Sequence, residues 1–190
     1  PDKLFKILEY KAYLFGGVLI NWECDNSLIK ENSQTPHSKK ICYKNGIIDY
    51  IKFKTSTIAM FTSSTFDGNV KIEDENVEWV VAWLTNNETS FTETYCNTVP
   101  TPLGGSHELG FRHALTKGIR NFADIKGFKK ANEIIYDDLI NSTGSILSIF
   151  IKNPQFQGQT KEKLVSLSSA KLVEIAIKDR FETWLSNDLS

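Results

Sequence analysis

A loop rich in amides and lysines joins an apolar strand pattern to an amphipathic helix pattern near the end of the chain. It covers Asn153–Leu164 and reads NPQFQGQTKEKL. Pro154 cannot donate to a strand ladder and therefore ends the preceding strand, and Gly158 permits backbone angles that a Cβ would forbid. Gln159 and Lys161 supply long side chains with hydrogen-bond donors, which can reach an anionic oxygen such as that of a phosphate. On residue types alone, a polar turn with a solvated lysine explains the same letters.

A glycine-rich turn, Gly104–Arg112 (GGSHELGFR), is the second candidate site. Its glycine spacing approaches that of a P-loop, but Phe111 stands where that motif needs a lysine, which argues against a Walker phosphate site. We interpret the turn as a helix start, with Ser106 as the N-cap and Glu108 favoured by the helix dipole. No serine or cysteine nucleophile is placed to use His107, so a structural hydrogen bond is expected for its ring.

The helix expected after this turn, Ser106–Lys126, carries a basic arc. Arg112, Lys117 and Arg120, with His113, fall on one side of a helical wheel. Such an arc is usually a solvated surface. Apolar residues fall on another arc and are expected to face the core; they are Phe111, Leu115, Ile119 and Phe122.

The first part of the chain alternates between helix and strand patterns. Lys3–Leu14 and Ile47–Phe53 show helical spacing of apolar residues. Val18–Trp22 reads as a short buried strand that pairs with Ile41–Tyr43, and the polar stretch Asp25–Lys40 between them reads as a flexible connection. The chain enters its first helix without a starting Met, so we expect a piece of a longer protein.

Beyond about residue 56 the pattern changes to the alternation typical of strands, followed by mixed helix and strand. The expected strands are Thr57–Ser63, Asn69–Glu73, Val77–Leu84, Phe91–Val99 and Gly144–Ile151. The expected helices besides Ser106–Lys126 are a short one within 131–140 and a closing one over Ser168–Asn187. Strands followed by mixed elements indicate an α+β domain, with helices layered on one face of a sheet. Its tryptophans, Trp79, Trp83 and Trp184, are expected in the core.

Bulk composition describes a folded cytoplasmic chain. The 190 residues are 41% hydrophobic and 12% aromatic, enough for one domain plus part of another. The formal charge of −1 provides no global basic field, so contact with DNA requires a local face. Cys24, Cys42 and Cys96 show no metal-ligand spacing; we expect reduced thiols and no metal site. No apolar run approaches the ~20 residues of a membrane span.

The loop PQFQGQTKEKL resembles the nucleotide-sensing loop of the ATPase subunit of type IIA DNA topoisomerases, the B subunit of DNA gyrase and topoisomerase IV. Other blocks resemble this family and follow its order; they are VEWVVAWL from Val77, TETYCNTVPT from Thr92, GGSHELGFR from Gly104 and KDRFETWL from Lys178. Together they cover essentially the whole chain. The tryptophans of the first and last blocks are more similar to topoisomerase IV than to gyrase.

The resemblance implies two parts. Residues 1–55 would be the C-terminal tail of a GHKL-type ATPase domain. Residues 56–190 would be a transducer domain with the ribosomal protein S5 domain 2-like fold, in which helices cover one face of a mostly antiparallel sheet and one βαβ crossover is left-handed. That handedness does not follow from the residue pattern, because right-handed crossovers are the default.

The resemblance also implies roles for the site residues. Lys161 and Gln159 would contact the γ-phosphate of ATP, and Gln159 would help to place the attacking water. Arg112 would face the cavity through which the transported duplex passes, with Arg120 and Lys117 as weaker companions. Loss of the γ-phosphate would free the loop, so the domain would couple ATP binding and hydrolysis to DNA strand passage.

The cofactors and partners implied are those of the family. ATP and Mg²⁺ would be bound mainly by the ATPase domain upstream of residue 1, which also carries the general-base glutamate, so these 190 residues alone are not expected to hydrolyse ATP. The partners would be duplex DNA, the DNA-cleaving A subunit of a heterotetramer, and a second copy of the full B subunit. Two alternatives stay open: an S5-fold nucleic-acid-binding module without nucleotide coupling, and the equivalent domain of a mismatch-repair ATPase.

Overall fold

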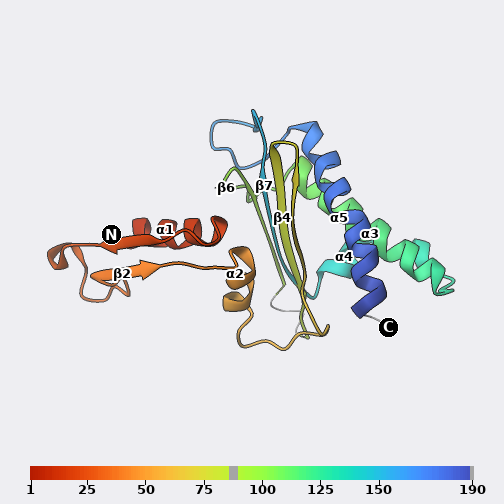
Figure 1. The fold of residues 1–190 in the computed structure, drawn as a ribbon, viewed down its shortest axis with the longest axis horizontal. Helices are drawn as coiled ribbons and strands as arrows, with labels where there is room; N and C mark the ends of the chain where they lie inside the picture. The colour runs from red at the N-terminus through yellow and green to blue at the C-terminus, as the bar shows by residue number, and fades with distance from the viewer. Residues whose placement is uncertain (86–89, 189–190) are drawn as a thin grey trace. The chain divides into compact units, whose positions relative to one another are not determined.

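The chain folds into two units, Pro1–Lys54 and Thr55–Ser190, in a computed structural model shown in Figure 1. The structure describes residues 1–85 and 90–188. The unit boundary lies within one residue of the boundary expected from the sequence. Among the described residues, none of the helices combines the length and apolar character that crossing a membrane requires.

The first unit packs one helix against a small two-stranded sheet. Helix α1 covers Asp2–Leu14, and the antiparallel strands are β1, Ile20–Glu23, and β2, Ser38–Ile41. A one-turn 3₁₀ helix, η1, covers Asn26–Leu28, and helix α2, Ile47–Lys54, closes the unit. Apolar side chains of the helix and of both strands form its core; they are Phe5, Ala12, Trp22 and Ile41.

The strand pairing expected in this unit is right in its partners and wrong in its bounds. Val18 and Leu19 lie outside β1 because Gly17 forms a turn there, in which its amide donates to the Tyr43 carbonyl at 2.9 Å. The register pairs Ile20 with Ile41, so β2 begins at Ser38, inside the polar stretch that was expected to be a connection. The lysines of β2 are exposed, as is common on a two-stranded edge.

The second unit is built on a five-stranded mixed sheet with the order β3-β4-β7-β5-β6. The pairing of β5 with β7 is parallel, and the other pairings are antiparallel. The expected α+β class and mostly antiparallel sheet are therefore confirmed. The strands are β3 Phe66–Ile72, β4 Glu75–Trp83, β5 Phe91–Cys96, β6 Val99–Pro100 and β7 Thr143–Phe150.

Two long helices cover one face of this sheet (Figure 1). They are α3, Ser106–Ile125, and α5, Leu167–Asp188. The two helices pack closely at Gly110, because this residue has no Cβ; a Cβ there would lie only 2.1 Å from the Ala170 carbonyl oxygen. Phe111 and Leu115 on α3 are buried in the core, as the helical wheel predicted. The other two members of the apolar arc, Ile119 and Phe122, are partly buried against the same core.

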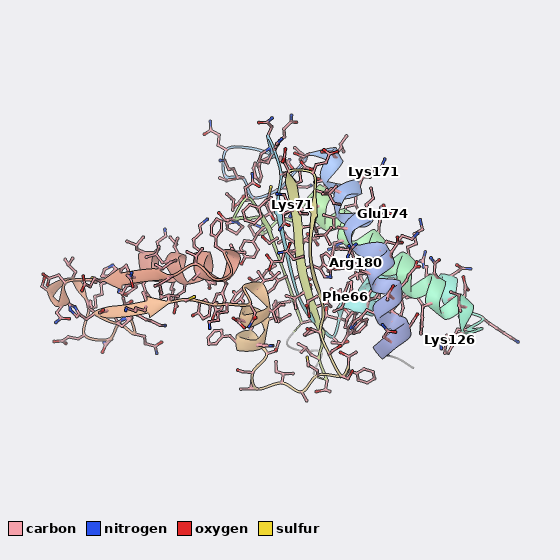
Figure 2. The ribbon with its side chains drawn as sticks, in the orientation of Figure 1. Phe66, Lys71, Lys126, Lys171, Glu174 and Arg180 are labelled. Atoms are coloured by element: carbon pink, nitrogen blue, oxygen red, sulfur yellow. The ribbon has the colours of Figure 1, made fainter. Side chains whose placement is uncertain are left out.

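Aromatic rings join the sheet to α5. Phe66 on β3 points toward α5, where its ring centre lies 4.9 Å from that of Phe181 (Figure 2). Trp79 is fully buried, and Trp83 stacks on Trp184 with ring centres 4.9 Å apart. The core role expected for the tryptophans is confirmed for Trp79, whereas Trp83 and Trp184 are partly buried against the same core.

Two expected elements of this unit are corrected. The strand expected at Thr57–Ser63 does not form; this segment makes only an isolated bridge from Met60 to Leu84. Its apolar side chains find no core to bury them, since Phe61 is 79% exposed. The helix expected within 131–140 is divided into a 3₁₀ turn, η3 (Ala131–Glu133), and a short helix, α4 (Tyr136–Ile140).

Candidate functional site

The lysine-rich loop is a hairpin that leaves the end of β7 and returns to the start of α5. The Gln157 amide donates to the Lys163 carbonyl at 2.9 Å, and the Val165 amide donates to the Gln155 carbonyl at 2.8 Å. These two bonds hold the arms of the loop together. The residues between them, 158–162, form the tip.

The base of the loop is joined to the glycine-rich turn before α3. The Leu164 amide donates to the Gly104 carbonyl at 3.1 Å, and the Ser106 amide donates to the Leu164 carbonyl at 3.0 Å. Leu164 is 1% exposed. The two backbones approach so closely that a Cβ on Gly105 would lie 2.2 Å from the Leu164 oxygen, which explains the glycine. Base and turn therefore form one rigid contact.

The tip presents the two predicted donors to solvent. Gln159 and Lys161 are exposed, and Lys161 adopts a left-handed backbone angle (φ +58°). The Lys161 ammonium lies 5.9 Å from the centre of the Phe156 ring. Within residues 1–85 and 90–188, neither side chain makes a hydrogen bond or ion pair. The supported loop therefore carries one ammonium and one amide in solvent, two donor types that suit an anionic oxygen.

Ser106 does not cap α3 as predicted. Gly105 is the N-cap residue, with φ +138°, and Ser106 is the first helical residue. The Ser106 hydroxyl instead donates to the Ser166 carbonyl at 2.7 Å and lies 2.8 Å from the Ser169 hydroxyl. The close approach of the loop to the glycine moves the helix start back by one residue, and the serine ties the start of α3 to the start of α5.

His107 lies buried beside this turn. Its Nε2 atom is 3.1 Å from the Thr101 hydroxyl, which confirms the structural hydrogen bond expected for the ring. Burial lowers the pKa of His107 to about 4, so the imidazole is neutral near pH 7. Its Nδ1 atom finds no partner in the described part of the chain.

The basic arc on α3 is divided between two sites. The first holds Arg112, whose guanidinium bonds the Glu108 carboxylate at 2.7 Å and lies 4.6 Å from the centre of the Tyr136 ring. This guanidinium lines a cavity of about 440 Å³, together with Gly105 and Lys163 at the base of the loop. Arg112 is therefore the member of the arc nearest to the loop.

The second site holds Lys117 and Arg120. The Arg120 Nε donates to the Ile134 carbonyl at 2.7 Å, and the Lys117 ammonium lies 4.0 Å from Glu174 on α5, which Figure 2 labels. Both cations line a separate cavity of about 380 Å³. The structure therefore brings Lys117 and Arg120 together but does not bring Arg112 to them.

Asn97 supports the loop, and the sequence analysis assigned it no role. Its side chain bonds both backbone groups of Ile151: Nδ2 donates to the carbonyl and Oδ1 accepts from the amide, each at 2.9 Å. Asn97 itself has φ +49°, a conformation that asparagine tolerates better than most residues. Asn97 falls inside the strand expected at Phe91–Val99, and the available signal was its residue type, because asparagine favours turns.

No metal site accompanies the loop within the described ranges. Residues 1–85 and 90–188 contain no group of three or more His, Cys, Asp or Glu side chains that could hold a metal ion. The donors at the tip suit an anionic oxygen rather than a metal ion, because ammonium and amide N–H groups do not ligate metals such as Mg²⁺.

Curated relatives of this chain are B subunits of DNA topoisomerase 4. The B subunit of DNA topoisomerase 4 from Caulobacter vibrioides is 42% identical over 192 residues, which cover 98% of this chain and 27% of that protein. The protein of the same name from Rickettsia prowazekii is 42% identical over 190 residues, 99% of this chain and 28% of that protein. The chain thus spans less than a third of the length of these relatives.

Solved structures of the same kind share the fold. The topoisomerase IV ATP-binding domain of Francisella tularensis, solved with a small-molecule inhibitor, matches with a TM-score of 0.78 and 27% identity, covering 97% of this chain and 48% of that one. The 43K ATPase domain of Thermus thermophilus gyrase B matches with a TM-score of 0.78 at 23% identity, covering 98% and 48%. The sequence model of the family described as DNA gyrase B matches residues 46–189. By sequence and by fold, the chain belongs to the DNA gyrase B family.

Proposed function

We propose that this chain is the transducer region of the ATP-hydrolysing subunit of a type II DNA topoisomerase. Residues 56–190 act as an S5 domain 2-like transducer, and residues 1–55 form the tail of a GHKL-type ATPase domain. Family membership and the names of the relatives support this assignment. The observation that carries the mechanism is the loop: exposed Gln159 and Lys161 at its tip, and a base hydrogen-bonded into the domain.

The tip of the loop senses the γ-phosphate of ATP. The Lys161 ammonium is a compact charge that suits the terminal phosphate, where negative charge concentrates, and the Gln159 amide adds a neutral donor that helps to place the attacking water. ATP and Mg²⁺ are held mainly by an ATPase domain outside these residues. Hydrolysis removes the group that Lys161 binds, which supplies the difference in affinity that a conformational switch needs.

The α3 helix faces the transported DNA. Arg112 is the leading contact because its side chain is 45% exposed and guanidinium N–H groups remain beyond those used for Glu108. Lys117 and Arg120 are weaker companions, since Arg120 already bonds a backbone carbonyl. In the cytoplasm, the full protein forms a heterotetramer with a second copy of itself and with the DNA-cleaving partner chains of the topoisomerase.

The test replaces one loop lysine at a time in the full-length protein, reconstituted with its DNA-cleaving partner. Lys161→Ala should lower ATP turnover and strand passage about 10- to 100-fold, the usual loss for one hydrogen bond to a charged group. Lys163→Ala is the matched control: its side chain is also exposed, at the base of the same loop, and its loss should change both rates less than twofold. Equal rates for the two variants would contradict the proposal.

A further inference from the structure

A cluster of buried polar side chains lies beneath the loop, at the start of the glycine-rich turn. Thr94 on β5 and Thr101 are 6% and 1% exposed, and their hydroxyl oxygens lie 2.7 Å apart. Each hydroxyl also reaches the other residue's carbonyl, at 3.0 Å from Thr94 and 2.9 Å from Thr101. His107, with no exposed surface, adds its Nε2 atom 3.1 Å from the Thr101 hydroxyl.

The hydrogen bonds assign the protons of this cluster. One hydroxyl must donate to the other across the 2.7 Å contact; when Thr101 is that donor, the Thr94 O–H donates to the Thr101 carbonyl and the Thr101 oxygen is left as an acceptor. His107 must then donate through Nε2–H, and its Nδ1 carries a lone pair. This arrangement leaves only an acceptor without a partner among the described residues, whereas the other tautomer would leave a buried donor unpaired as well.

Thr101 and His107 bracket the turn that holds the loop. Within the turn, the Gly104 amide donates to the Thr101 carbonyl at 2.8 Å. Outward from it, the Leu103 amide donates at 3.0 Å to the carbonyl of Glu162, the last residue of the tip. The turn is therefore attached to the core through Thr101 and to the loop through Leu103 and through its contact with Leu164. A displaced turn would displace the tip.

We propose that Thr101 and His107 are positioning residues for Lys161: their buried hydrogen bond fixes the glycine-rich turn, and the turn fixes the loop in the position from which the lysine reaches a phosphate. The claim that Lys161 reaches a phosphate rests on the proposed function. The claim that the hydrogen bond between Thr101 and His107 holds the loop in place does not. His107, which takes no part in the proposed contact with phosphate, thereby gains a positioning role.

The mechanical part is tested by amide hydrogen exchange of the nucleotide-free, full-length protein. Thr101→Val and His107→Leu each remove one partner and should speed exchange of the Leu103 and Leu164 amides at least about tenfold. His107→Gln, which keeps an N–H donor of similar reach, should restore slow exchange.

A buried threonine far from the turn provides the control. Thr143 is 1% exposed, bonds the Ile140 carbonyl at 3.1 Å and begins β7, at the end of the strand opposite the loop. Thr143→Val should leave exchange in the loop unchanged. If Thr101→Val and His107→Leu leave loop exchange unchanged too, or if all three variants speed it equally, the inference is overturned.

The functional part is tested by combining variants. Thr101→Val should lower ATP turnover about tenfold in the wild-type background and cause no further loss when Lys161 is already alanine, because both changes then remove one contact. Equal loss in both backgrounds would overturn the inference. If Lys161→Ala alone has no effect, the proposed function fails, and the exchange data alone decide whether the turn positions the loop.

Discussion

The base and the tip of one loop differ in nearly every physical respect. At the base, Leu164 is buried and its amide and carbonyl are both bonded to the turn before α3. At the tip, Gln159 and Lys161 are exposed, and a Cβ added to Gly158 would meet open space. The contrast teaches that the loop is a supported arm rather than a flexible one. The two proposed ligand-binding side chains lie at the exposed end of this arm.

The largest effect on the free energy of unfolding is expected when a glycine at each end of the loop is replaced by alanine. Gly105→Ala places a Cβ 2.2 Å from the Leu164 oxygen at φ +138°, so we expect a loss of about 3 kcal/mol or more in the free energy of unfolding. Gly158→Ala, at φ +75° in open space, should cost only about 1 kcal/mol. Urea unfolding of both variants measures the difference, and similar losses would contradict a rigid base.

The pH dependence of stability tests the buried histidine at the base. Burial holds the pKa of His107 at about 4, below its ordinary value of 6.5. Between these values the unfolded chain binds the proton and the folded chain does not, so stability should fall as pH falls from 6.5 toward 4. The full difference amounts to about 3 kcal/mol. His107→Gln should remove this part of the pH dependence in urea unfolding.

A half-buried carboxyl in the sheet supplies a control of opposite sign. Burial raises the pKa of Glu78 on β4 to about 7 from its ordinary value of 4.5. Its folded form keeps a proton that the unfolded form loses, so its contribution is fully present below pH 4.5 and is lost as pH rises through 7. Glu78→Gln should therefore change the slope in the direction opposite to His107→Gln. Equal slopes in both variants would contradict these environments.

The smallest effect is expected at Arg112, beside the base. Arg112→Gln should change unfolding by less than about 1 kcal/mol, because the pair with Glu108 is partly exposed. In the reconstituted enzyme it should lower DNA-stimulated ATP turnover about threefold and leave basal turnover unchanged. The salt dependence of DNA binding should lose about one phosphate contact.

A second cation removed elsewhere shows whether position matters. Lys171, which Figure 2 labels, lies on α5, and Lys171→Gln removes its exposed charge without changing the basic arc on α3. It should leave DNA stimulation unchanged. If Arg112→Gln and Lys171→Gln have the same effect on stimulation, total charge rather than Arg112 is responsible.

Much of the fold followed from local patterns, where local physics decides the outcome. The periodicity of α3 placed Phe111 and Leu115 in the core, and Pro154 follows closely after the end of β7. The strand expected at Thr57–Ser63 was wrong, because an alternating pattern does not show whether the segment will find a partner strand and a core that buries its apolar side chains.

The donors of the candidate site were visible in the sequence, but the support of the loop was not. Residue type and family resemblance pointed to Lys161 and Gln159; the structure places both at one exposed tip, and their role stays a prediction. The contact of Leu164 with Gly105, the Asn97 clamp and the cluster around Thr101 join segments distant in sequence. Such contacts depend on the tertiary fold, which no local pattern encodes.

The central claim, that Lys161 contacts the outermost phosphate of ATP, is tested most directly by the chemical reactivity of its amine. The full-length protein is acylated briefly with no nucleotide, with ADP or with a non-hydrolysable ATP analogue, and labelling is quantified by mass spectrometry. We predict that the triphosphate lowers Lys161 labelling about tenfold or more, that ADP does not, and that Lys163 labels equally in all three states. Equal labelling of Lys161 with the triphosphate and with ADP would contradict the account.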